Sequence, residues 1–304
     1  MFTDLTGKKC FKLGLHTHTN RSDGKCTPEE VARIYKEAGY DAIAITDHWK
    51  YGPACELAGL TVFSGAEYNL DTGDTAYGGA HIVGLCMTKE PDIRQAGCTI
   101  QDAIDAIHAA DGIAVLAHPA WSLCQVEDML GYRDIDATEI FNTVSGVHES
   151  DRPYSGVLLD LLANRGRFWP LFASDDAHYY DGTDEVTAAI YIHADTLTRE
   201  TFIDAVRRGD FYASLSRTPD KPRTAHPGPE VHLTREGDVI RLICTPVDKI
   251  SFLSNRAWVG NRILRGKHLT EAVYPIHPAE HYVRAEVTDS QGLVAYSNYI
   301  VIDE

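Results

Sequence analysis

The 304-residue sequence lacks any pair of cysteines spaced as Cys-x-x-Cys, and its seven cysteines are an odd number scattered along the chain. This pattern excludes a thiolate zinc site and a regular disulfide framework, so we expect reduced thiols and a cytoplasmic location. No apolar run approaches the roughly 18 residues of a membrane-spanning helix. The first residues also show no cleavable signal pattern, and we therefore expect no membrane partner.

Positive charge is scarce in this sequence. The 28 lysines and arginines are outnumbered by 44 acidic residues, which gives a formal net charge of −16. We therefore expect no binding of a nucleic-acid duplex, whose phosphate backbone requires a basic surface. An acidic protein that handles an anionic substrate needs a local source of positive charge, and metal ions are one such source.

One structural unit recurs along the first two thirds of the chain. Thr27-Pro28-Glu29-Glu30 is a capping box with proline at the first helical position, and the apolar segment "DAIAIT" follows that helix. Further helices are predicted after Thr99, within "YSGVLLDLLANRG" and after Thr198. About seven strands are almost wholly apolar, as in a parallel sheet that helices cover on both faces. The alternation predicts an α/β barrel or a doubly wound sheet.

The character of the sequence changes after Ser216. Four prolines occur in the fifteen residues "SRTPDKPRTAHPGPE", and alternating apolar and polar residues follow. We predict an α/β domain at residues 1–217, a proline-rich linker at 218–229 and a small antiparallel, β-sandwich-like module at 230–304. Within the first domain, "YNLDTGDTAYGGA" has hairpin turn residues, which should place His81 on a returning strand.

His16 and His18 stand one residue apart where the first predicted strand ends. Side chains i and i+2 of a strand point the same way, so two imidazoles can bind one metal ion from one side. Other predicted strands end in similar residues, and the carboxyl ends of parallel strands meet at one edge of an α/β fold. These residues are Asp47-His48, Glu67, His118 and Asp176-Ala177-His178, with Asp23 and His81 in adjoining loops.

Each of these residues alone has an ordinary explanation as a surface, core or capping residue. Their joint occurrence at five strand ends predicts a metal site. Six histidines and three carboxylates are too many for one tetrahedral zinc, but they suit two or three manganese, iron or zinc ions. Asp47 and Asp175 each stand beside a predicted ligand. Either carboxylate could accept a hydrogen bond from a ligating imidazole and orient it, without binding the metal itself.

The segments "HTHTNRSDG", "AITDH", "GAE", "HIVGL", "AHP" and "SDDAH", in this order, resemble the polymerase and histidinol phosphatase (PHP) superfamily over about residues 11–216. The resemblance implies a distorted, TIM-like (β/α)7 barrel with a di- or trinuclear metal centre. It implies one ion held by His16, His18, Glu67 and Asp176, a second held by Glu67, His81 and His118, and a third held by Asp23, His48 and His178.

The "SDG" form of the first motif resembles small phosphoesterases of this superfamily. It implies hydrolysis of a phosphate ester of a small molecule or nucleotide (EC 3.1.3 type) by a hydroxide that bridges the metal ions. The catalytic residues would be His16, His18, Glu67 and Asp176, with Arg21 as the phosphate clamp.

Each candidate for a substrate contact also has a plain structural explanation. Arg21 and then Arg152 are candidates to bind phosphate, since the planar guanidinium binds two oxygens. Asn142 ends the sixth strand, Trp121 follows "AHP", and His148 is a candidate proton donor. The expected partner is a small phosphate ester or nucleotide, and a homo-oligomer is left open.

Two other functions remain as alternatives. An amidohydrolase or carbamate hydrolase could use the same metal centre, but no strand end offers a lysine for carboxylation except Lys50. A non-catalytic PHP scaffold is disfavoured because all nine expected positions hold ligand types. In the C-terminal module, Trp258 with Arg256 and Arg262 marks either a contact surface or a packing strand.

Overall fold

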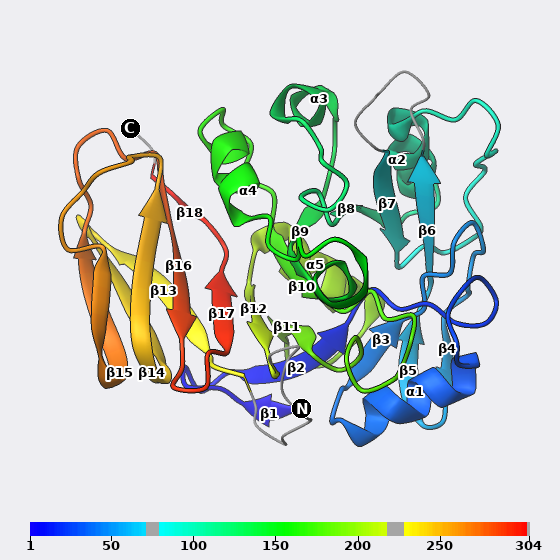
Figure 1. Ribbon diagram of the computed structural model, residues 1–304, viewed down its shortest axis with the longest axis horizontal. Coiled ribbons are helices and arrows are strands. Elements are labelled where there is room, and N and C mark those ends of the chain that lie inside the picture. The colour runs from blue at the N-terminus through cyan, green and yellow to red at the C-terminus, as the bar shows by residue number, and fades with distance from the viewer. Residues whose placement is uncertain (71–78, 218–227, 303–304) are drawn as a thin grey trace.

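The computed structural model describes residues 1–70, 79–217 and 228–302, and it shows an α/β fold with two sheets (Figure 1). The smaller sheet has the spatial order β10-β9-β8-β7-β6. Its strands are β6 (Gly65–Leu70), β7 (Ala80–Leu85), β8 (Ile113–Ala117), β9 (Ala137–Asn142) and β10 (Leu171–Ser174). The tip of the predicted hairpin, residues 71–78, lies outside the described residues, and so does most of the predicted linker, residues 218–227.

The larger sheet runs in the order β13-β14-β16-β17-β12-β11-β2-β3-β5-β4, with β1, β15 and β18 beside β2, β14 and β16. The strands of its N-terminal part are β1 (Phe2–Thr3), β2 (Lys9–Gly14), β3 (Ala42–Ala44), β4 (Cys55–Leu57), β5 (Leu60–Phe63), β11 (Ala188–His193) and β12 (Phe211–Leu215). The C-terminal strands are β13 (Val231–Glu236), β14 (Val239–Ser254), β15 (Ile263–Pro275), β16 (Tyr282–Thr288), β17 (Val294–Ser297) and β18 (Ile300–Val301).

The predicted (β/α)7 barrel is not confirmed, because the described strands form two sheets and no closed ring. Strand direction also departs from the prediction: β2, β3 and β5 are parallel, but β11 is antiparallel to both β2 and β12, and β7 is antiparallel to both β6 and β8. Single bridges nevertheless join the two sheets, between Thr17 and Ala177 and between His48 and Glu67. The sheets therefore meet beside the His16 and His18 motif.

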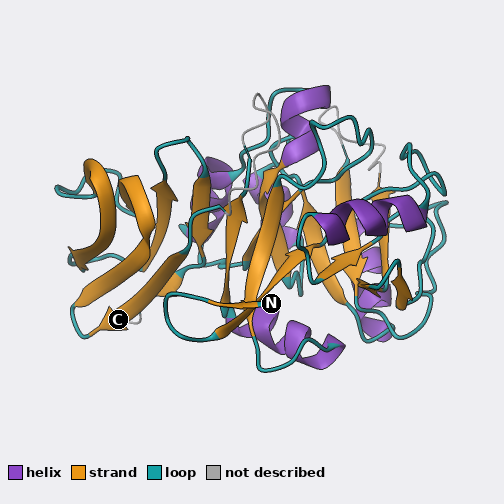
Figure 2. Ribbon diagram, turned by 90° about the horizontal axis from the view of Figure 1, so that it is seen from below, coloured by secondary structure: helices purple, strands orange, loops and turns teal. Residues whose placement is uncertain are grey.

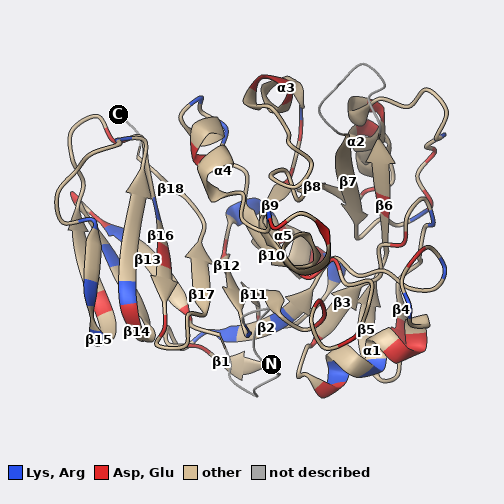
Figure 3. Ribbon diagram, in the orientation of Figure 1, with Lys and Arg blue, Asp and Glu red and all other residues tan. Residues whose placement is uncertain are grey.

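The helices flank the strands on both sides (Figure 2). They are α1 (Pro28–Glu37), α2 (Ile100–Ala109), α3 (Val126–Gly131), α4 (Gly156–Ala163) and α5 (Arg199–Arg208), with a π-helical turn η1 (Ser145–Glu149). Thr27, Thr99 and Thr198 all accept a hydrogen bond from the backbone of the first turn, and each forms a capping box. Acidic and basic residues are intermixed along the exposed side of α1 (Figure 3).

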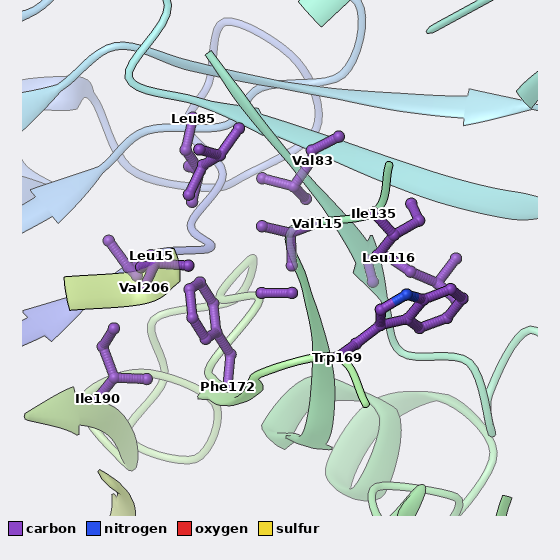
Figure 4. Close-up of a cluster of buried hydrophobic side chains, with 14 of the residues drawn as sticks. Leu15, Val83, Leu85, Val115, Leu116, Ile135, Trp169, Phe172, Ile190 and Val206 are labelled. Atoms are coloured by element: carbon purple, nitrogen blue, oxygen red, sulfur yellow. The ribbon is translucent and has the colours of Figure 1, made fainter. Parts of the chain in front are cut away.

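A hydrophobic core fills the space between the two sheets and the helices beside them. Figure 4 shows Phe172 of β10, Ile190 of β11 and Val206 of α5 in this core with Val115 of β8. Burial of each such side chain contributes about 1.5–3 kcal/mol. The core therefore holds the two sheets together and supports the polar residues at their shared edge.

The C-terminal strands continue the larger sheet, because β17 pairs with β12. They form the part drawn in yellow to red in Figure 1. Trp258 lies in the turn between β14 and β15 with 89% of its surface exposed, so it does not pack as part of a strand.

Within the described ranges, no helix combines the length and the apolar character that a membrane crossing requires.

His108 near the end of α2 gives a pH-dependent prediction. Its Nε2 lies 2.7 Å from Asp136 Oδ2, and this hydrogen bond raises the pKa of His108 above its ordinary value. The folded state therefore favours the protonated imidazole. The stabilisation is complete below the unfolded pKa of about 6.5 and is lost as the pH rises through the higher folded pKa.

We expect the His108→Gln variant to be less stable than the wild-type protein by about 0.5–1.5 kcal/mol near pH 6. The difference should shrink toward pH 9, where the wild-type imidazole is neutral. Urea unfolding of both proteins across this pH range measures the effect, and a difference that stays constant with pH would contradict the assignment.

Candidate metal centre

The nine predicted ligand residues lie together in three groups, and in each group one donor atom per residue lies within 4.8 Å of the others. The groups are His16, His18, Glu67 and Asp176; Glu67, His81 and His118; and His18, Asp23, His48 and His178. These are the sets that the resemblance implies, with His18 added to the third. Their role as metal ligands stays a prediction.

Strand geometry directs His16 and His18 toward the same point. Thr17 between them turns the other way and donates from Oγ1 to the carbonyl of Ala44 at 2.9 Å. Asp176 N donates to His16 O at 2.9 Å, and His18 N donates to Ala177 O at 2.9 Å. These backbone bonds fix the register between the segment after β2 and the segment after β10, so Asp176 lies opposite the two imidazoles.

Local backbone geometry is unusual at several positions of the site. His118 and Asp176 adopt positive φ angles of 27° and 54°, which costs about 1–3 kcal/mol for residues other than glycine. Gly24 packs so closely on the preceding turn that a Cβ atom would lie 2.5 Å from His18 O. The glycine of the "SDG" motif is therefore required for the turn that presents Asp23.

Glu67 is the central carboxylate of the site and is buried. Its Oε2 atom lies 3.2 Å from His16 Nε2, 3.0 Å from His18 Nε2 and 3.3 Å from His48 Nδ1. Its Oε1 atom lies 2.8 Å from His81 Nδ1 and 3.4 Å from His118 Nε2. Both oxygens therefore face imidazole nitrogens, as expected of a carboxylate that bridges two cations.

Asp176 completes the first group from the opposite side. Its Oδ1 atom lies 3.1 Å from Nε2 of both His16 and His18, and its Oδ2 atom lies 3.7 Å from His118 Nε2. Two atoms that bind one ion at about 2.0–2.2 Å in tetrahedral or octahedral geometry lie about 3.0–3.5 Å apart. The spacing of the donors around Asp176 and Glu67 is of this size.

Buried donor atoms without a partner show that the site suits cations. These atoms are His16 Nε2, His18 Nε2, His48 Nδ1, Glu67 Oε2 and Asp176 Oδ1, and none has a hydrogen-bond partner. A buried polar atom without a partner costs about 1–3 kcal/mol. Five such atoms aimed at a common volume are explained by divalent ions of the manganese, iron or zinc kind, which accept nitrogen and oxygen ligands.

The third group is more exposed than the other two. Asp23 Oδ1 lies 3.5 Å from His178 Nε2, and Asp23 Oδ2 lies 3.6 Å from His48 Nε2. Burial alone would lower the pKa of His178, but its hydrogen bond with Asp23 and the charge of Asp176 raise that pKa to about 9. This group stands at the mouth of the site, where Asp23 is half exposed.

The charges of the first group perturb one another strongly. Burial alone would lower the pKa of His16, but the surrounding carboxylates, Asp176 first, raise that pKa well above its ordinary value. Burial alone would raise the pKa of Asp176 and Glu67, and His16 instead lowers both. A cation bound among these groups would take over the role of the imidazole protons, so its binding would release protons.

Sequence reasoning missed Glu139, which orients the first histidine. Glu139 lies in β9, is 1% exposed and places Oε1 2.8 Å from His16 Nδ1. Its Oε2 accepts from the backbone of His118 and from Asn142 Nδ2, at 2.9 and 2.8 Å. With Nδ1 committed to Glu139, the lone pair of His16 Nε2 faces Glu67 and Asp176. The available signal was a carboxylate inside the apolar strand "ATEIF", which requires a buried partner.

Replacement of Glu139 by glutamine is expected to weaken metal binding about 10–100-fold. The amide cannot accept from all three donors, so His16 would lose its fixed orientation. Competition titration with a metal chelator measures the affinity, and circular dichroism checks that the variant is folded. Unchanged affinity would show that packing alone holds His16.

The two alternative carboxylates have other roles. Asp47 accepts hydrogen bonds from Thr19 and Ser22, so it holds the loop before Asp23 and contacts no imidazole. Asp175 is buried and accepts from Tyr35, from Thr143 and from the backbone at residues 187 and 188. Burial raises the pKa of Asp175 to about 7 despite these bonds. Asp176, and not Asp175, therefore faces the metal centre.

A cavity of about 280 Å³ opens beside the three groups. Trp121 lines it, with its ring centroid 4.8 Å from that of His118 and 5.5 Å from that of His81. Lys25 also lines the cavity, and sequence reasoning missed it. Lys25 places an ammonium group in the lining of the cavity, beside the predicted metal ligands.

The other predicted substrate contacts lie outside the lining of this cavity. The guanidinium of Arg21 donates to Tyr51 O, and Asn142 is buried between Glu139, Asp176 and Ser145. His148 bonds to Thr183 Oγ1 and stacks on Tyr179, and the backbone of Arg152 donates to Ser145. Their roles in substrate binding stay predictions.

Residues 14–114 match the sequence model of the PHP domain. Over this segment the chain is similar to the PHP domain. The matched segment includes six of the nine clustered residues, from His16 to His81, and the strands beside them. The other three, His118, Asp176 and His178, follow the matched segment.

Individual proteins with similarity to this chain are distant from it in sequence. An uncharacterized protein of Methanocaldococcus jannaschii is 27% identical over 149 residues, which cover 43% of this chain and 81% of that protein. A crystal structure from Bacteroides vulgatus, of a two-domain protein containing a predicted PHP-like metal-dependent phosphoesterase, has a TM-score of 0.56 at 16% identity. It covers 98% of this chain and 96% of that one, so the fold is shared over both parts of the molecule.

The exclusion of nucleic-acid duplexes as partners is wrong. A crystal structure of endonuclease Q in complex with a 27-mer duplex substrate aligns with 66% of this chain and 57% of its own, with a TM-score of 0.48 and 14% identity. In that structure the substrate bound to endonuclease Q is a duplex. Net charge alone does not exclude such a partner, because binding depends on local charge and on metal ions and not on the sum over the chain.

Proposed function

We propose that the PHP domain is a metal-dependent phosphoesterase that hydrolyses a phosphate ester of a small molecule or nucleotide. The observation that carries the proposal is the set of buried donors without partners around Glu67, beside a cavity of about 280 Å³. Cavities of roughly 300 Å³ and above bind small ligands. The cavity is therefore close to the size that a compact phosphate ester needs.

The three groups of side chains would each hold one ion. Glu67 would bridge the first and second ions, since its two oxygens face different imidazoles. Two or three manganese, iron or zinc ions would supply Lewis acidity toward phosphate oxygens and lower the pKa of water. We assign the catalytic role to His16, His18, Glu67 and Asp176 through this centre.

Residues of the chain around the centre would position the substrate. Asn142 Nδ2 donates to Asp176 Oδ2 at 3.2 Å and holds that carboxylate in place. Trp121 forms an apolar wall beside His81 and His118, where it would exclude water. Lys25 would attract the phosphate, and Arg21 would join it only after release of its bond with Tyr51 O.

The test combines elemental analysis with a hydrolysis screen. The full chain is purified without chelator, its metal content is measured, and phosphate release is followed over phosphomonoesters and nucleotides. Phosphodiesters, a DNA duplex, amides and carbamates are assayed in parallel, with Glu67→Gln as the inactive control. We expect the wild-type protein to release phosphate and the Glu67→Gln variant to release none. Fewer than one ion per chain, or cleavage of amides or carbamates without any phosphate ester, would contradict the proposal.

A further inference from the structure

A second cluster of histidine and aspartate lies at the opposite end of β2 from the metal centre. Asp4 follows β1, His193 ends β11, and His232 lies in β13, and their donor atoms lie within 4.8 Å of one another. His193 pairs in register with Cys10. Since Cys10 and His16 are six residues apart along the strand direction, about 20 Å separates the two clusters.

His193 is oriented as a metal-binding histidine. Its Nδ1 lies 2.7 Å from Asp210 Oδ1, within hydrogen-bond distance. Asp210 accepts a hydrogen bond from the Nδ1–H group of His193, which leaves the lone pair of the neutral imidazole on Nε2. A histidine whose second nitrogen donates to a carboxylate is the usual arrangement beside a bound metal.

Asp4 directs one oxygen into the same space. Its Oδ1 accepts from Thr6 N, Thr6 Oγ1 and Lys8 N at 2.8, 2.7 and 3.0 Å, so the turn holds the carboxylate rigidly. Its Oδ2 lies 2.7 Å from His193 Nε2 and 3.8 Å from His232 Nε2. The carboxylate therefore has one oxygen committed to the turn and one free for a ligand.

Two of these donor atoms are buried without a hydrogen-bond partner. The side chains of Asp4 and His193 are 0% and 9% exposed, and neither Asp4 Oδ2 nor His193 Nε2 makes a hydrogen bond of acceptable geometry, although they are close. Facing lone pairs at 2.7 Å repel unless a proton or a cation neutralises them. The nearby nitrogen of His232 favours a cation, because it adds a third ligand.

We infer that Asp4, His193 and His232 bind one divalent ion of the zinc kind at a structural site separate from the PHP centre. Two histidines and one carboxylate are a common ligand set for zinc. Glu230 Oε2, 3.5 Å from His232 Nε2, is the nearest candidate for a fourth ligand. The ion would tie the N-terminal turn to β11 and to the first C-terminal strand, β13, and would thereby stabilise the junction between the two parts of the chain.

Zinc stoichiometry of full-length variants tests this site independently of the proposed phosphoesterase activity. The Glu67→Gln substitution weakens metal binding at the candidate metal centre around Glu67. The Glu67→Gln variant should bind one more zinc ion per chain than the Glu67→Gln/His232→Gln double variant. His281→Gln, which changes an exposed histidine, serves as the control and should leave the stoichiometry unchanged. The single His232→Gln variant should keep its phosphoester turnover.

Equal zinc binding with and without His232 would overturn the inference, and would indicate a protonated His193 bridging Asp4 and Asp210. If the His232→Gln chain does not fold, thermal unfolding of the Glu67→Gln protein decides the question. Saturating zinc should raise its Tm by about 5 °C, because an ion that binds only the folded chain stabilises it. No zinc-dependent rise in Tm in that protein, or the same rise in its Asp4→Asn derivative, would also overturn the site.

Discussion

Replacement of Glu67 by glutamine is expected to lower phosphoester turnover at least about 1,000-fold, equivalent to about 4 kcal/mol of transition-state stabilisation. The substitution keeps the size of the side chain and removes its charge. An amide nitrogen donates and cannot bind a cation, so the variant could not bridge two ions. We expect the purified variant to contain fewer metal ions per chain than the wild-type protein.

The Glu67→Gln chain should remain folded. In the absence of metal the wild-type site buries a carboxylate among five imidazole nitrogens, and a neutral amide in that place requires less compensation. Circular dichroism and thermal unfolding check the fold, and elemental analysis reports the metal content. His16→Ala should also abolish turnover in a folded chain.

Glu56→Gln is the matched control, since Glu56 is an exposed residue of β4 away from the site. It should leave turnover and metal content unchanged. Near-normal turnover by the Glu67→Gln variant would show that the ligand assignment is wrong, because no other carboxylate of the site contacts both the first and second groups so closely.

Replacement of Arg284 by methionine is expected to destabilise the protein by about 3–5 kcal/mol. Arg284 of β16 is fully buried and donates from Nε and Nη2 to both oxygens of Asp160 in α4, at 2.7 Å each. Its Nη1 donates to Glu286 at 2.6 Å. Methionine fills similar volume but leaves two carboxylates without their counter-ion at the contact between α4 and the C-terminal strands.

Urea unfolding measures the effect, and Arg241→Met provides the comparison. Arg241 pairs with Glu236 at 3.0 Å, but both side chains are more than 40% exposed, so loss of this pair should cost at most about 1 kcal/mol. Equal destabilisation by the two substitutions would show that burial does not strengthen the Arg284 pairs. A change in catalytic turnover is not expected from either variant.

Local signals in the sequence were sufficient to predict the helices that begin with capping boxes. Thr27, Thr99 and Thr198 each satisfy backbone groups within three residues, so their effect does not depend on the rest of the fold. The spacing of His16 and His18 is local in the same sense, because alternation along a strand sets where both side chains point. The clustering of the nine residues could be anticipated because strand ends share an edge.

Strand direction and sheet closure could not be read from the sequence. An apolar strand such as β7 or β11 shows the same pattern whether its neighbours run parallel or antiparallel, and here both are antiparallel to their neighbours. The predicted barrel therefore stays unconfirmed although most of its strands were located. The same limit applies to Asp175 and Asp176, which are adjacent in sequence but contact different groups. Asp175 accepts hydrogen bonds from Tyr35 and Thr143, whereas Asp176 faces His16 and His18.

The sequence by itself determined the residue types available for catalysis, the positions of the capped helices and the edge at which polar side chains gather, because each depends on neighbours within a few residues or on one strand's periodicity. Tertiary structure alone decided which polar groups are satisfied. Glu139 is committed to His16, Arg21 to Tyr51, and Arg284 to Asp160, whereas the donors around Glu67 and between Asp4 and His193 lack partners. Hydrogen bonding of buried groups depends on contacts between residues far apart in the chain, which no local pattern records.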